Sequence, residues 1–396
     1  MKLIGNVSGW LVLAVILNCF SLVVRSQTTD YSFRKALSDK AGFGPTDISA
    51  LDDGKLIVKT LTTNDKEVVA IVGIIRIKDL PSTSMSDFRS SITQRDNKTV
   101  RAGGKFSDPP TDQDLKDLDL EEKDLEALKK CVVGDCDMNM SAESIRQFGM
   151  VDWDSSDRKP VVNQLFRSML LRYALDYSSG GDRTLGKYEN RKKNVDLPEV
   201  HRSLLANSLF VADLSPELNK YLGGYPTASL KGAESELYWS TINFGLKPAI
   251  ALTHTIAYDG SRAGLRQYFV ANKQIYASRY LDASLSFSML ISFGSSESGG
   301  YLIFTDRSMS DALGGILGGV ARSVVENEAI ERVKGVLSSA ELRLISGPNR
   351  SAGPDPDITD SHNDAVPFYR NPIVIVAVSI AIAVIVFFLL RRRGRQ

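Results

Sequence analysis

Histidine and cysteine are scarce in this chain of 396 residues, which has three of each. The histidines, His201, His254 and His362, stand far apart, and no Cys/His cluster has the spacing of a zinc site. The chain also lacks the Gly-x-Ser-x-Gly elbow, the His-Glu-x-x-His helix, the phosphate-binding loop and the dinucleotide-binding glycine fingerprint. We therefore expect no cofactor, no metal and no catalytic residues, and a hydrolase ranks third among the candidate functions.

No charge of one sign dominates, because 48 Lys and Arg residues nearly balance 47 Asp and Glu residues. Such a chain has no overall field to attract nucleic acid, so no nucleic-acid partner is expected. Its densest acidic stretch, residues 112–126, includes Lys116 and Lys123 and lacks the Asp-x-Asp-x-Asp-Gly calcium pattern, which indicates a solvated helix face. Apolar residues make up 43% of the chain, enough for a sizeable folded core.

The three cysteines indicate the redox compartment. Cys19 falls in an apolar N-terminal stretch, which leaves Cys131 and Cys136 as a close pair in Cys-Val-Val-Gly-Asp-Cys. The pair matches neither a Cys-x-x-Cys redox motif nor a haem-attachment site, and no second cluster completes a zinc site. We predict a disulfide between Cys131 and Cys136, with metal or redox chemistry as the alternative.

Long apolar runs lie at the two ends of the chain. Residues 373–390 are uncharged, would extend roughly 27 Å as a helix, and precede four arginines within 391–396. Lys2 precedes the apolar stretch 10–24, with small residues before Gln27. These patterns predict a signal peptide (1–26), a flexible stalk (346–371), a transmembrane helix (372–390) and a basic cytoplasmic tail (391–396). The bulk of the chain is then expected in the periplasm or outside the cell.

Between these ends the pattern changes twice. Residues 27–106 predict an α+β segment, with a helix near 33–41 and a hairpin of strands 56–61 and 68–77. Helical signals dominate residues 107–234, including an amphipathic helix over 160–177. His201 stands on a predicted helix among charged neighbours, so it is expected at the surface.

Residues 235–345 show the clearest pattern, an antiparallel set of strands followed by one long helix over 309–345. In residues 285–293, apolar side chains alternate mainly with serines, so one face of the strand is apolar and the other mostly hydroxyl. His254 shares the register of Ile250, Leu252 and Ile256 on the apolar side of its strand. Gly314-Gly315 and Gly318-Gly319 predict close packing of the helix onto the sheet, with a mobile helix start or a protein contact as alternatives.

A curved antiparallel sheet followed by a long C-terminal helix resembles the helix-grip arrangement of START-like lipid-binding domains. The resemblance rests on the order of elements in residues 235–345 and on no motif. It implies a cavity for an apolar ligand between sheet and helix. The residues expected to line this cavity are His254, Tyr276, Leu285, Phe287, Met289 and Ile291. For His254, the simpler alternative is a buried histidine with a hydrogen-bond partner.

These patterns together predict an α+β fold: an antiparallel sheet packed on a long C-terminal helix, a helical middle segment and a single C-terminal transmembrane helix. The favoured function is a membrane-anchored extracytoplasmic protein that binds an apolar or amphiphilic ligand. The alternative is a protein-interaction or envelope-structural module without a small-molecule ligand. The expected partners are the membrane, through residues 373–390, and a lipid or another protein.

Overall fold

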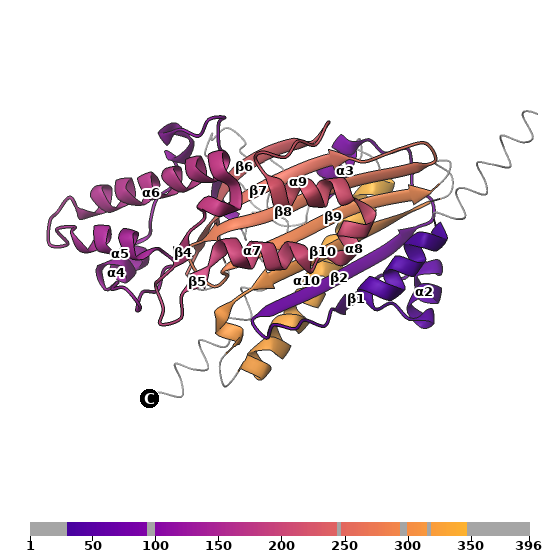
Figure 1. Ribbon diagram of the computed structural model, residues 1–396, viewed down its shortest axis with the longest axis horizontal. Coiled ribbons are helices and arrows are strands. Elements are labelled where there is room, and N and C mark those ends of the chain that lie inside the picture. The colour runs from indigo at the N-terminus through magenta and orange to yellow at the C-terminus, as the bar shows by residue number, and fades with distance from the viewer. Residues whose placement is uncertain (1–29, 93–99, 244–246, 294–298, 315–317, 347–396) are drawn as a thin grey trace, which may run out of the picture.

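The computed structural model describes residues 30–92, 100–243, 247–293, 299–314 and 318–346, which fold around one eight-stranded antiparallel sheet (Figure 1). The order of strands across the sheet is β1-β2-β10-β9-β8-β7-β6-β3. The strands are β1 (Ile57–Thr60), β2 (Val68–Ile77), β3 (Val100–Lys105), β6 (Glu234–Ile242), β7 (Ala249–Asp259), β8 (Leu265–Ala277), β9 (Ala283–Phe293) and β10 (Gly300–Met309). The long strands β7 to β10 form the centre of the sheet.

Strands from both halves of the sequence build this sheet. The last strand, β10, pairs with β2 over ten residues, from Gly300 opposite Ile77 to Met309 opposite Val68. At the other edge β3 pairs with β6, although more than a hundred residues separate them. The strands of the N-terminal segment therefore share one sheet and one core with the strands of residues 234–309.

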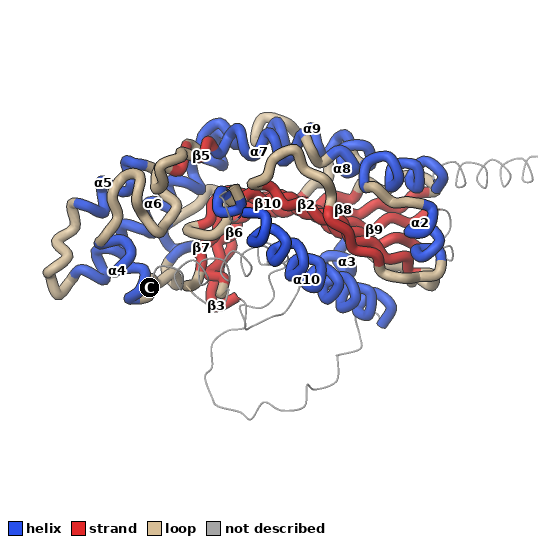
Figure 2. Tube along the Cα trace, turned by 90° about the horizontal axis from the view of Figure 1, so that it is seen from below, coloured by secondary structure: helices blue, strands red, loops and turns tan. Residues whose placement is uncertain are grey.

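Helices cover both faces of the sheet (Figure 2). The α-helices are a helix over residues 30–41, α2 (Pro45–Asp52), α3 (Met85–Ile92), α4 (Glu122–Lys129), α5 (Ala142–Gly149), α6 (Arg158–Gly180), α7 (Leu197–Ala206), α8 (Leu209–Leu214), α9 (Pro216–Gly224) and α10 (Gly318–Ser346). Short elements connect them: η1 (Asp112–Leu115), η2 (Gly181–Thr184), η4 (Asp311–Leu313) and the β4 (Lys187–Tyr188)–β5 (Val195–Asp196) pair. Helices α7, α8 and α9 lie on one face, whereas α10 and α3 lie on the other (Figure 2).

A glycine of the sheet lets α10 approach closely. A Cβ atom on Gly73 of β2 would come within 2.6 Å of both Val333 and Leu337 of α10. The glycines of the predicted strip behave differently. Gly314 caps η4 before α10 begins, and a Cβ on it would meet Glu67, whereas a Cβ on Gly319 in α10 would meet no atom within 4 Å. The close approach of helix and sheet therefore occurs at Gly73. Gly314 and Gly319, which belong to the predicted glycine strip, do not permit it.

One element of the predicted fold class has to be corrected. Within the part of the chain that the structure describes, no helix has both the length and the apolar character needed to cross a membrane. The predicted transmembrane segment 372–390 lies outside the described residues, as do the predicted signal peptide, most of the stalk and the basic tail. The fold seen in the described residues is an α+β fold around a large antiparallel sheet.

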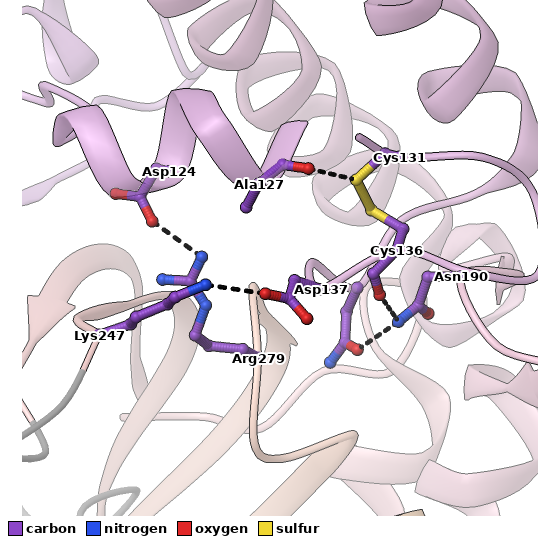
Figure 3. Close-up of a disulfide and its surroundings, with 9 residues drawn as sticks. Asp124, Ala127, Cys131, Cys136, Asp137, Asn190, Lys247 and Arg279 are labelled. Atoms are coloured by element: carbon purple, nitrogen blue, oxygen red, sulfur yellow. Dashed lines mark hydrogen bonds and ion pairs between the residues drawn. A yellow bond between two sulfur atoms is a disulfide. The ribbon is translucent and has the colours of Figure 1, made fainter. Parts of the chain in front are cut away.

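Cys131 and Cys136 form a disulfide that closes a short loop after α4 (Figure 3). The Sγ of Cys131 lies 3.3 Å from the carbonyl oxygen of Ala127. The backbone amides of Gly134 and Cys136 donate to the carbonyl oxygens of Glu189 and Asn190, both at 2.9 Å. These hydrogen bonds hold the loop in place together with the disulfide.

Replacing both cysteines with serine is expected to lower the free energy of unfolding by about 2 kcal/mol, because a loop of this length restrains little entropy of the unfolded chain. Chemical denaturation of the purified protein measures this loss. The backbone hydrogen bonds of the loop remain in the variant, so the native fold should persist. An unchanged midpoint of unfolding would contradict the prediction.

Candidate ligand-binding site

The six residues predicted to line a cavity do lie on one side of the sheet, but this side faces away from α10. Phe287, Met289 and Ile291 of β9 are at most 1% exposed and belong to the same core cluster as residues of α6 and α7. Leu285 and Tyr276 lie in that cluster too. The serine side of β9 is the one that shares a face with α10, since Ser288 pairs with Phe304 and Phe304 pairs with Gly73. The apolar side is thus covered by the helical middle segment.

His254 is fully buried on this helix-covered face, and both of its ring nitrogens have partners. Nδ1 lies 2.8 Å from the hydroxyl of Tyr177, and Nε2 lies 2.7 Å from the hydroxyl of Ser235. Burial, with a further contribution from the charge of Lys273, lowers the pKa of His254 to about 3. This histidine therefore stays neutral at physiological pH and connects α6 to the sheet.

Lys273 is a buried cation on the same face. Its side chain is 3% exposed and forms an ion pair with Asp182 of η2. Its ammonium nitrogen also lies 5.9 Å from the centre of the Tyr177 ring. Burial lowers the pKa of Lys273, and the carboxylate of Asp182 partly offsets this effect.

His201 was predicted at the surface, and the structure corrects this expectation. It is 1% exposed on the sheet-facing side of α7, and among the described residues neither ring nitrogen has a hydrogen-bond partner. Burial holds its pKa well below the usual range, and the positive charge of Lys273 lowers it further. The charged residues next to His201 in the sequence, which suggested exposure, lie on the other side of α7.

Strand register aligns these groups in one row across the sheet. His254 pairs with Lys273, Lys273 pairs with Leu285, and Leu285 pairs with Arg307 of β10. Directly paired residues point to the same face of an antiparallel sheet, so Arg307 belongs to the helix-covered face. Arg307 is thus a second basic side chain on this face, two strands away from Lys273.

Arg307 lines a pocket of about 1030 Å³ at the β1–β2 end of this face. The other walls come from residues 39–42 at the end of the first helix, the hairpin 59–68, Lys193, the α7–α8 region and Gly314. Apolar side chains in these walls are Ala41, Leu61, Val68, Leu204 and Leu209. The lining therefore combines apolar side chains with basic groups and with the acidic residues Asp39, Asp65 and Glu67.

Of the two half-buried basic residues of the pocket, Lys59 and Arg307, Arg307 has no anionic partner among the described residues, whereas Lys40 and Lys66 are exposed. Lys193 binds both carboxylate oxygens of Glu67 at 2.7 Å, and Lys59 binds Asp47 at 2.6 Å. In the described part of the chain, no hydrogen bond or ion pair is formed by the guanidinium of Arg307, which is half-buried. Burial lowers the pKa of Arg307, and Asp306 acts in the opposite direction. An unpaired, partly desolvated guanidinium is a ready site for a carboxylate or phosphate.

No family model, no curated protein and no solved structure matches this chain. The resemblance to START-like domains therefore stays a prediction. Within the described residues, no group of three or more His, Cys, Asp or Glu side chains is arranged to hold a metal ion.

Proposed function

We propose that the protein binds an anionic amphiphile in the pocket that contains Arg307. The observation that carries the proposal is the half-buried guanidinium without a partner, because a buried cation is stable only when an anion or a polar ligand compensates its desolvation. The proposed ligand places its anionic group at Arg307. Its apolar part contacts the walls formed by Leu61, Leu204 and Leu209.

Two further features support a ligand of mixed character. Leu209 lines the pocket and is 49% exposed, so it offers apolar surface that the apolar part of a ligand can cover. The pocket volume of about 1030 Å³ is at the upper end of the range typical of small-molecule sites.

The disulfide between Cys131 and Cys136 supports a compartment outside the cytoplasm, where such bonds persist.

Oleate is the probe for this proposal. Isothermal titration of the purified protein should show saturable binding of oleate and much weaker binding of the uncharged oleyl alcohol. Arg307→Met should weaken oleate binding by about 10- to 100-fold, because a charge-assisted hydrogen bond contributes about 1.5–3 kcal/mol. It should leave the binding of oleyl alcohol nearly unchanged.

Arg266→Met provides the matched control. Arg266 is also a half-buried arginine of the central sheet, but it pairs with Ser292 and so lies on the opposite face. The control variant should bind oleate as the wild type does. Equal binding of oleate by wild type and Arg307→Met, or no binding by either, would refute the proposal and favour the interaction module.

A further inference from the structure

The pocket that contains Arg307 has a local excess of positive charge. Five basic and three acidic side chains line it, although the whole chain is nearly neutral, with 48 Lys and Arg residues and 47 Asp and Glu residues. Two of the three acids already have lysine partners, because Glu67 pairs with Lys193 and Asp39 pairs with Lys35. The excess is therefore a property of this pocket and not of the whole molecule.

Two exposed lysines of the lining have no anionic partner. Lys40 ends the first helix and Lys66 lies in the hairpin between β1 and β2, and neither forms an ion pair among the described residues. Asp65 is an acid of the lining that has no cationic partner in the described part of the chain, so it offsets one of these charges. Together with Arg307, three unpaired cations stand against one unpaired carboxylate.

Apolar surface lies at the same opening. Leu209, the first residue of α8, lines the pocket and is 49% exposed. Lys40, Lys66 and Leu209 belong to three different elements of the chain, and we name these three residues the pocket mouth. The surface of a bilayer suits this combination, because lysines attract anionic headgroups while an apolar side chain enters the boundary between headgroups and acyl chains.

Other macromolecules fit the pocket mouth less well. The described residues that line the pocket include no aromatic side chain, so single-stranded nucleic acid would find no surface on which its bases could stack. The core of a protein interface usually contains several aromatic or large apolar anchors. At this opening the exposed large apolar side chain among the described residues is Leu209.

We propose that the pocket mouth docks onto the surface of an anionic lipid bilayer. Lys40 and Lys66 contact the anionic headgroups, and Leu209 enters the headgroup region. This inference rests on the function proposed above, because a bilayer is the surface at which an anionic amphiphile would reach the pocket.

A fluorescent probe at the pocket mouth tests the docking. Leu209→Cys, combined with Cys19→Ser in the full chain, leaves one free thiol for a nitrobenzoxadiazole label, because Cys131 and Cys136 are joined. Vesicles of phosphatidylcholine with about 30% phosphatidylglycerol should shift the emission of the label to shorter wavelength, since the label leaves water. The shift should be absent with pure phosphatidylcholine and should be lost in about 0.5 M NaCl, which screens the lysines.

Lys40→Gln/Lys66→Gln in the labelled protein should lower the equilibrium constant for docking about 10- to 30-fold, because two attractions to the anionic leaflet are lost. Lys123→Gln/Lys130→Gln is the matched control and should leave the shift unchanged. It removes two exposed lysines at α4, in the group of helices α4 to α6 that forms one end of the molecule (Figure 1). A label at Met150→Cys, which follows α5 and is 79% exposed, should show no shift.

Three results would overturn the proposal: no shift of the label at Leu209→Cys, an equal shift with both kinds of vesicle, or an equal response with and without Lys40→Gln/Lys66→Gln. A shift that grows with protein concentration in the absence of vesicles would also overturn it, and would show that the pocket mouth binds a second copy of the chain. Oleate titration of the wild type without vesicles tests the proposed function separately. If oleate binds and the label does not respond, the docking alone is wrong; if the label responds and oleate does not bind, the proposed ligand is wrong and the docking surface stands.

Discussion

Arg279→Met is expected to lower the free energy of unfolding by about 3–5 kcal/mol, because it leaves a buried carboxylate without its counter-ion. The Nη2 of Arg279, which follows β8, lies 2.8 Å from Oδ1 of Asp124 in α4 (Figure 3). The two side chains are only 5% and 6% exposed, so water cannot replace the lost partner. Arg279 also donates to the backbone oxygen of Pro248, which connects the end of β8 to the start of β7.

The double variant Arg279→Met/Asp124→Leu is the informative control. It removes both charges, so its stability should recover most of the loss seen in the single variant. Urea denaturation at pH 7 measures the stability of the wild type and of both variants. If the double variant is as unstable as Arg279→Met, Arg279 does not stabilise the protein through its ion pair with Asp124.

Strand positions could be predicted from the sequence where side chains alternate strictly. The alternation of residues 285–293 is found as β9, and the apolar run 68–77 is found as β2. Strand β8 continues through Lys273 and Gln274, two polar residues that a local apolar pattern does not place in a buried strand. Lys273 is buried against Asp182, which is 91 residues away in sequence, and no local pattern reveals such a partner.

The covering of the two sheet faces was the main point that the sequence could not decide. An apolar strand face requires burial, but its pattern is the same whether the covering helices come before or after the sheet in the chain. The predicted cavity residues Leu285, Phe287 and Met289 were grouped correctly on one face and assigned to the wrong covering helix. Arg307 was missed because a basic residue near the end of a strand is usually exposed.

The stability of the wild-type protein is expected to fall between about pH 4 and pH 7 because of Asp306. Burial raises the pKa of its carboxyl to about 7 in the folded protein, whereas in the unfolded chain it is close to 3.9. The folded state therefore holds the proton more tightly, and its advantage is complete below pH 4 and is lost as the pH approaches 7. A difference of about three pKa units corresponds to roughly 4 kcal/mol.

Asp306→Asn isolates this effect, since the amide keeps the shape of the side chain and does not ionise. The stability difference, variant minus wild type, should rise with pH from 4 to 7 by up to roughly 4 kcal/mol and then level off. Other buried acids such as Asp282, whose pKa burial also raises, are present in both proteins and cancel in the comparison. Asp259→Asn, at an exposed position of β7, should show no such rise. A difference for Asp306→Asn that is constant over this range would mean that the buried carboxyl keeps its proton at pH 7 or never binds it at pH 4.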